Sequence, residues 1–542
     1  MDARAVAQEP SAGRSLRTQK APVRRSGGPL PRLGRVRDRV PPRLQLPLAI
    51  FVAAELGFLC YWFAFYPALL SYDSVAYTWQ VTTDHWSTNH SIVYNALVWL
   101  SLRVSGGVAL LTLAQTVAFA AALAFAATGI HQLGVRARWA ALPAVVLPYT
   151  PMLGPFPVYV WKDVPFVACE IVLLGCTARL LAARQADRAS WFRERRTSRI
   201  LGGIFLSLLG MALFRSNGFL FAVLAALLIA LAVPRVRLRS LAAGVAAAVL
   251  AIGLNTAVFP ALGAATPASD LVLGPAYADI AVAYHTRPGV FTGAELALMR
   301  QVAPLKSWDK GGQNCYSSDV LNAQKTWSRT AADRVHEQLF TLWRQVLTRT
   351  PDFVFQARIC RGAIAWSIWP ANPRLGPTAF PNLSLPADFF GWAKYLRPGV
   401  KDVLRPDAPS SQLHDAGKFL VAASHTRQLE WVLWRGATWA YLGYLAVFLA
   451  SRRRRNWALL ALAAGTASNQ LNVLVNNPNQ LVRYMIGCSY LGALLLPLAL
   501  RSAESADRVV VGDPRPRPAT DRKRQVGAAT GTRRSPHSMT TR

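Results

Sequence analysis

The sequence has few charged residues, and acidic residues are the scarcest of them. Only 16% of the residues are charged, 27 of them Asp or Glu, while 52% are hydrophobic and fall mostly in long unbroken runs. A soluble chain cannot bury so many runs of this kind, whereas a bilayer offers them an apolar solvent. We therefore predict a mainly α fold, a polytopic transmembrane helical bundle of about ten spans with one large outer α-rich domain.

Three further features are missing: a cleavable signal peptide, an internal repeat and any CxxC pair. The first apolar run begins only near Leu44, after a basic tail that is typical of disorder. The absence of a repeat disfavours a transporter built from two related halves. Four cysteines fall in apolar runs, but Cys315 and Cys360 fall in the predicted outer domain, where a disulfide and two free thiols are both open.

Basic residues are abundant, and their positions indicate topology. A net charge of +33 is typical of nucleic-acid-binding proteins, but the arginines cluster between or beside the apolar runs. The clusters lie before residue 44, at 184–199, 235–239 and 452–455, and after residue 501. Cytoplasmic loops carry such an excess. We expect a multi-pass protein of the cytoplasmic membrane with both termini cytoplasmic, surrounded by membrane lipids and without a nucleic-acid partner.

The alternation of apolar runs and arginine clusters divides the chain into regions. The predicted spans are residues 44–65, 108–130, 139–153, 164–183, the two arms of a hairpin within 200–233, 241–262, 431–450, 457–475 and 481–500. Residues 92–104 are predicted to form a helix on the outer surface. The predicted regions are a disordered basic cytoplasmic tail (1–43), an N-terminal transmembrane region with outer loops (44–262), an extracytoplasmic domain (263–427), C-terminal transmembrane helices (428–500) and a second disordered basic cytoplasmic tail (501–542).

The unusual polar residues gather at one predicted membrane depth, on the outer side. They come from loops far apart in the sequence: Asp73, His90, Lys162, Asp163, Arg215, Asn217, Arg483 and Tyr484. Each has an ordinary explanation, because a loop carboxylate can cap a helix, a histidine can hold a hydrogen bond and a long cation can reach the headgroups. Arg215 stands out, because an arginine inside an apolar stretch is costly and is usually partnered.

This set of residues suits a lipid-linked phosphate substrate, whose headgroup stays at the membrane surface. Lys162, Arg215 and Arg483 could hold the phosphate by charge-assisted hydrogen bonds, with His90, Asn217 and Tyr484 as further binding residues. Asp73 or Asp163 could accept a proton from a hydroxyl. Alternatively, the two carboxylates could hold a divalent cation, but no spacing of His, Asp and Glu is a metal signature, so the cation stays optional.

The ordered motifs resemble the GT-C superfamily of integral-membrane glycosyltransferases, in particular the bacterial group related to protein O-mannosyltransferases. The motifs are Leu70-Ser-Tyr-Asp-Ser74, the segment that ends at His90, Trp161-Lys-Asp163, Phe214-Arg-Ser-Asn-Gly218 and Arg483-Tyr484. The likeness covers about residues 45–500. The chain departs from this pattern in having Asp73-Ser74 where some relatives have two adjacent acids, and in lacking prolines after His90.

The resemblance implies transfer of a hexose or pentose from a polyprenyl-phosphate donor to an envelope glycan, lipid or protein. It implies that Asp73 is the catalytic base or a metal-associated carboxylate and that Asp163 is its companion. A transporter or flippase for a lipid-linked glycan is the main alternative; it would place ionisable groups such as Glu170 near the middle of the bilayer. A non-enzymatic scaffold or receptor with a polymer-binding outer domain is a third.

Overall fold

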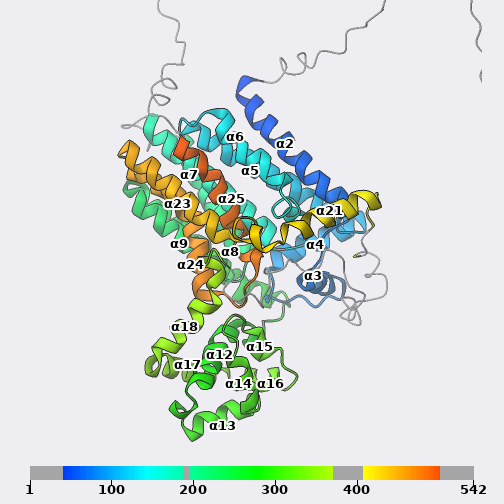
Figure 1. The fold of residues 1–542 in the computed structure, drawn as a ribbon, viewed down its shortest axis with the longest axis vertical. Coiled ribbons are helices and arrows are strands. Elements are labelled where there is room, and N and C mark those ends of the chain that lie inside the picture. The colour runs from blue at the N-terminus through cyan, green and yellow to red at the C-terminus, as the bar shows by residue number, and fades with distance from the viewer. Residues whose placement is uncertain (1–40, 187–194, 370–403, 405–406, 501–542) are drawn as a thin grey trace, which may run out of the picture. The chain divides into compact units, whose positions relative to one another are not determined.

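The computed structural model describes residues 41–186, 195–369, 404 and 407–500. The chain divides into two units, residues 1–45 and 46–542. Of the first unit the structure describes only residues 41–45, at the start of helix α2 (Pro42–Ala64). The described residues are mainly helical, and they contain isolated β-bridges but no strand (Figure 1). The predicted α class is thus confirmed. Most of the two predicted disordered tails lies outside the described residues, which include only residues 41–43 of them. Part of the arginine cluster at 184–199 also lies outside the described residues.

Six helical stretches among the described residues are long and apolar enough to cross a membrane, which indicates a membrane protein. They comprise α2, α5 (Ala109–Gln132), α7 (Asp163–Ala186), α8 (Arg195–Phe214), the stretch Pro234–Ala261 that contains α10 (Arg237–Gly253), and the stretch Trp457–Asn476 that ends in α24 (Ala464–Asn476). Each coincides with a predicted span.

Four other predicted spans fall on helices that lack this combination of length and apolarity. They are α6 (Ala137–Val146), α9 (Gly218–Ala232), α23 (Gly436–Arg454) and α25 (Ile486–Leu495), the last continued by a 3₁₀ turn, Leu496–Leu500. The helix α6 gives way to a 3₁₀ turn at Leu147–Tyr149, and α23 carries three arginines in its last turn. The predicted hairpin is present, since α8 ends at Phe214 and α9 begins at Gly218.

One hydrophobic core joins the apolar helices. It includes buried residues from α2, α5, α7, α8, α9 and α25, for example Phe58, Phe119, Ile171 and Tyr490. Small residues permit close helix contacts: a side chain on Gly175 of α7 would come within 2.5 Å of the Phe125 ring of α5. Such small residues are the usual means by which apolar helices approach one another in a membrane.

Residues 66–91, the predicted outer loop between the first span and the surface helix, contain a helix that the sequence pattern did not reveal. Helix α3 (Tyr72–Thr82) begins after Ser71, whose backbone N–H donates to Ser74 Oγ at 2.9 Å. The apolar-run criterion missed it because it is short and rich in polar residues. The next helix, α4 (Ile92–Ser105), matches the predicted surface helix; its N-cap Ser91 accepts from the Tyr94 N–H, and it ends at Gly106 with a φ of 70°.

A second, separate hydrophobic core lies within the predicted extracytoplasmic region. It is built by α12 (Ser269–Thr286), α13 (Gly293–Val302), α14 (Leu305–Gly312), α16 (Arg329–Arg334), α17 (His336–Arg349) and α18 (Pro351–Arg361) around Tyr277, Trp308 and Leu339. We call residues 269–366, up to the end of α19 (Ala363–Trp366), the polar domain. Helix α18 begins at Pro351, because proline suits the first position of a helix, where its missing N–H costs no hydrogen bond. Residues 370–403 and 405–406 of the predicted region lie outside the described residues.

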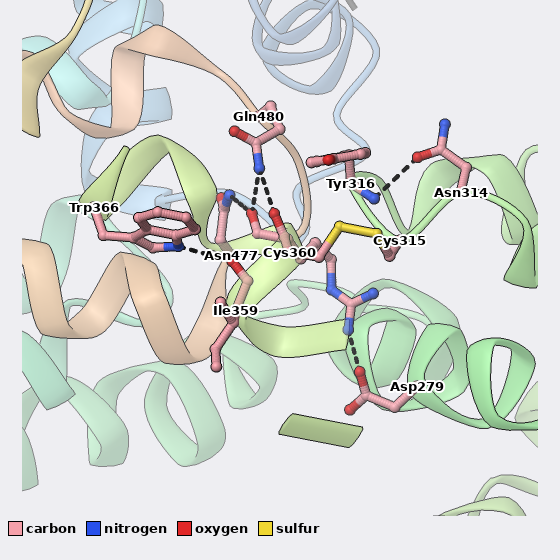
Figure 2. Close-up of a disulfide and its surroundings, with 10 residues drawn as sticks. Asp279, Asn314, Cys315, Tyr316, Ile359, Cys360, Trp366, Asn477 and Gln480 are labelled. Atoms are coloured by element: carbon pink, nitrogen blue, oxygen red, sulfur yellow. Dashed lines mark hydrogen bonds and ion pairs between the residues drawn. A yellow bond between two sulfur atoms is a disulfide. The ribbon is translucent and has the colours of Figure 1, made fainter. Parts of the chain in front are cut away.

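A disulfide joins Cys315 to Cys360, the two cysteines singled out in the sequence (Figure 2). It links the turn before α15 (Asp319–Asn322) to α18. Close by, Asp279 accepts from Trp343 Nε1 at 3.0 Å and from Arg358 Nε at 2.7 Å, and it also contacts Arg361. Two further helices, α21 (Ser411–Ser424) and α22 (Arg427–Leu433), then lead back to α23.

Candidate functional site

A cavity of about 350 Å³ brings together most of the predicted site residues. Six of the eight line it: Lys162, Asp163, Arg215, Asn217, Arg483 and Tyr484. Its remaining walls come from loops and from α9, α12 and the end of α24: Thr88, Asn89, Ser216, Phe219, Leu220, Pro267, Leu271, Val272, Pro275, Asn476 and Pro478. Asp73 and His90 do not line it, but each contacts a residue that does.

Several helices begin at this cavity. Helix α7 starts at Asp163, α9 starts at Gly218 just after Asn217, and α25 starts shortly after Arg483 and Tyr484. The first backbone N–H groups of a helix have no partner within the helix, and its N-terminus carries a partial positive charge. The local fold therefore favours negative charge at this place, whether from a side chain or from a bound anion.

Asp163 and Arg215 form an ion pair across the cavity wall, with 3.4 Å between Arg215 Nη1 and Asp163 Oδ1. Their side chains are 2% and 11% exposed, and within the described residues Asp163 Oδ1 accepts no hydrogen bond. The Arg215 guanidinium also lies 5.1 Å from the Phe166 ring and 4.9 Å from the Tyr484 ring. The arginine inside the apolar stretch thus has a carboxylate and two aromatic faces as partners.

Asp73 and Arg483 form a second ion pair, although 410 residues separate them. Asp73 lies in the first turn of α3 and its side chain remains 25% exposed. Burial raises the pKa of this carboxyl, but the charge of Arg483, together with His90 and Lys162, outweighs burial and holds the pKa below its usual value. The Arg483 guanidinium also lies 5.4 Å from the Trp161 ring.

Lys162 and His90 meet beside these pairs, with 3.2 Å between Lys162 Nζ and His90 Nδ1. Burial, and then the charge of Lys162, lower the pKa of His90 to about 3. The histidine is therefore neutral at physiological pH and accepts a hydrogen bond from the lysine. Burial also lowers the pKa of Lys162, although Asp73 and Asp163 act against that effect. The His90 ring meets the Tyr77 ring edge-on at 4.9 Å.

The two predicted outer loops that carry Asp73 and Asp163 lie side by side. Leu69 pairs with Tyr159 in a parallel bridge, and Ser74 Oγ donates to the Val160 carbonyl at 2.9 Å. Trp161 Nε1 donates to Ser71 Oγ at 2.6 Å. These contacts hold the start of α3 against the start of α7, so the two carboxylates are positioned by adjacent backbone segments.

The loop from Asn476 to Gln480 connects the cavity to the polar domain. Pro478 accepts from the Ser318 N–H at 2.9 Å. Asn477 Nδ2 donates to the Arg361 carbonyl at 2.7 Å, and Gln480 Nε2 donates to the Cys360 carbonyl at 2.8 Å (Figure 2). Asn476 and Pro478 were not named as site residues, yet both line the cavity. The sequence signal was the run Asn476-Asn-Pro-Asn479, a polar segment between two apolar ones.

The sequence leaves a divalent cation between Asp73 and Asp163 as an option. The part of the chain that the structure describes contains no group of three or more His, Cys, Asp or Glu side chains that could hold a metal ion. Asp73 and Asp163 each pair with their own arginine instead. Glu170 does not line the cavity; it is buried against α25, where only a glycine at 487 leaves room for its carboxylate.

The structure thus places all eight predicted site residues in one connected group, although their roles remain predictions. Comparison of the chain with family models, with curated proteins and with solved structures finds no match.

Proposed function

We propose that the protein is a membrane glycosyltransferase of the GT-C type, which transfers a sugar from a polyprenyl-phosphate donor to an acceptor on the outer face of the cytoplasmic membrane. In this proposal α6, α9, α23 and α25 complete about ten spans, and both termini are cytoplasmic. One observation carries the proposal: Lys162, Arg215 and Arg483 line the same cavity as Asp163, and Asp73 is in contact with Arg483.

The charges of the cavity favour a phosphate. The three cations that line it outnumber its one lining carboxylate, Asp163, and several helix N-termini add to the positive potential. A volume of about 350 Å³ lies at the small end of the range for ligand sites, which suits a sugar-phosphate headgroup better than a whole lipid. The polyprenyl tail would remain in the bilayer beside the apolar helices.

Asp73 is the proposed base, and its ion pair explains how it would be activated. A carboxylate with a depressed pKa is a weak base while Arg483 holds it. A donor phosphate that binds Arg483 offers the guanidinium a second anion and weakens its hold on Asp73, so the basicity of the carboxylate rises when the donor is bound.

Sugar transfer exchanges one bond at the anomeric carbon for another. The oxygen of the acceptor hydroxyl forms a bond to the anomeric carbon, and Asp73 takes the hydroxyl proton. The bond from the anomeric carbon to the phosphate oxygen breaks, and the polyprenyl phosphate leaves with that electron pair, its charge stabilised by Lys162, Arg215 and Arg483. Glu170, the buried carboxylate expected of a transporter, does not line the cavity.

The test compares Asp73→Asn with Asp84→Asn in cells that lack the native gene. Asp84 is an exposed carboxylate in the same loop, so its variant is a matched control for loss of charge. We expect Asp73→Asn to lower transfer by about 10²–10⁴-fold, the usual contribution of a general base. Mass spectrometry of lipid-linked sugars and surface glycans would show an accumulated donor and a missing glycan. Full activity in Asp73→Asn would remove this residue from the mechanism.

A further inference from the structure

A second cavity, of about 900 Å³, opens at the other end of two helices that frame the first. Residues near the C-terminal ends of α7 and α9, namely Arg184 and Ala232, line the second cavity, whereas Asp163 and Phe219 near their N-terminal ends line the first. The 24 residues of α7 span roughly 36 Å, about the thickness of the hydrocarbon core of a bilayer. The two cavities therefore lie toward opposite ends of a membrane-length helix.

The walls of the second cavity are mostly apolar and open to the surroundings. Leu231 of α9, Phe448 of α23 and Trp457 line it, and they are 62%, 44% and 53% exposed. Leu228 and Tyr444 also line it and lie about one and three turns before the ends of α9 and α23. The cavity thus extends from the helix ends along the apolar surface, as the site of an acyl chain would.

Two arginines lie at the C-terminal ends of α7 and α23, beside the second cavity. Arg184 lies in the last turn of α7, and Arg455 directly follows α23; both line the cavity. None of the described residues that line it is acidic. Arg455 also belongs to the run Arg452–Arg455, which we expect to face the cytoplasm. An occupant that matches these walls carries an anionic group at one end and an apolar chain at the other.

We propose that this cavity binds an anionic phospholipid, with its phosphate between Arg184 and Arg455 and an acyl chain along α9 and α23. Charge complementarity favours this occupant, because basic pockets between membrane helices on the cytoplasmic side hold anionic headgroups, and arginine binds phosphate well. The proposal does not depend on the sugar-transfer function, which concerns the first cavity.

The test measures lipid binding to the full-length protein in detergent by native mass spectrometry. Phosphatidylglycerol is compared with phosphatidylcholine of the same acyl chains, for the unaltered protein and for the double variant Arg184→Gln/Arg455→Gln. The control is Arg452→Gln/Arg453→Gln, which removes the same charge from exposed residues that do not line the cavity. We expect tighter binding of phosphatidylglycerol, weakened roughly five-fold for each cavity arginine removed and little changed in the control.

Three outcomes would overturn the proposal: equal retention of the two lipids, equal losses in both double variants, or tighter retention of a polyprenyl phosphate than of phosphatidylglycerol. The single variants Arg184→Gln and Arg455→Gln are measured in parallel. If the double variant does not fold, each single variant tests the proposal by its expected loss, roughly five-fold, of phosphatidylglycerol binding.

Discussion

The polar domain and the candidate site both bury aspartate beside arginine, but they do so differently. Asp279 is fully buried and has three partners, Trp343, Arg358 and Arg361. Asp163 is almost as inaccessible, yet its one ion pair with a described residue spans 3.4 Å and it borders a cavity. A carboxylate with a complete set of donors fixes a structure, whereas one with incomplete pairing beside a cavity can exchange its partner for a ligand.

The two regions also differ in what their arginines touch. Arg358 reaches from Asp279 to the Val475 carbonyl at 2.8 Å, so it contributes to holding the polar domain against the end of α24. Arg358 also lies over the Trp343 ring, as Arg215 and Arg483 lie over rings of their own, but only the latter two line the cavity. In the proposed function, the same residue type therefore serves attachment in one region and ligand binding in the other.

Asp279→Asn should destabilise the protein strongly. The change leaves Arg361 buried without its counter-charge, which typically costs about 3–5 kcal/mol. Thermal unfolding of the purified protein would measure the loss, with the exposed Asp352→Asn of α18 as control, for which we expect less than about 0.5 kcal/mol. Transfer activity per folded molecule should be nearly unchanged. If Asp279→Asn were no less stable than Asp352→Asn, the pairing would not be structural.

Removal of the disulfide by Cys315→Ser/Cys360→Ser should cost about 2–4 kcal/mol of stability, because the bond closes a loop with a sequence separation of 45. Both linked segments lie beside the Asn476–Gln480 loop, which borders the cavity, so we also expect weaker donor binding. Unfolding and donor titration with and without reductant would show both effects. Cys60→Ser, which removes a free thiol, serves as control. If it changed donor binding as much as the disulfide variant did, the disulfide would have no specific role in supporting the site.

Arg215→Gln should raise the KM for the lipid-linked donor by about 10–100-fold, the usual range for loss of a charge-assisted hydrogen bond. Arg344 is an exposed arginine of α17 that does not line the cavity, so Arg344→Gln should leave the KM unchanged. Initial rates over a range of donor concentrations separate KM from kcat. A loss confined to kcat, with an unchanged KM, would contradict a role of Arg215 in holding the donor.

The smallest effect concerns pH. Since the folded pKa of Asp73 lies below its ordinary 3.8, the Asp73–Arg483 pair stabilises the protein above pH 3.8 and loses this contribution as the pH falls further. The difference in stability between the unaltered protein and Asp73→Asn should therefore be constant from about pH 5 to 8. Unfolding measured at several pH values in one buffer series checks this. A difference that varies steeply around neutral pH would show that Asp73 is not held ionised by Arg483.

The sequence was sufficient for the apolar helices but not for every element near the site. Uninterrupted apolar runs predicted α5 and α7 to within a few residues, because burial in lipid requires a minimum length of apolar helix. The same criterion missed α3, which is short and polar and is held by contacts such as that of Ser74 with Val160. The polar run Asn476-Asn-Pro-Asn479 was visible in the sequence, but the hydrogen bond from Ser318 of the polar domain to Pro478 is a tertiary contact that no local pattern encodes.

The sequence by itself determined that the chain forms apolar helices and where its unusual charges fall, since both follow from hydropathy and from the positions of Asp73, Asp163, Arg215 and Arg483 along the chain. Only the tertiary structure decided the pairing: Asp73 with Arg483, Asp163 with Arg215 and Lys162 with His90. The reason is physical. Helix length and burial depend on local composition, whereas an ion pair between residues 410 positions apart depends on how distant helix ends pack together.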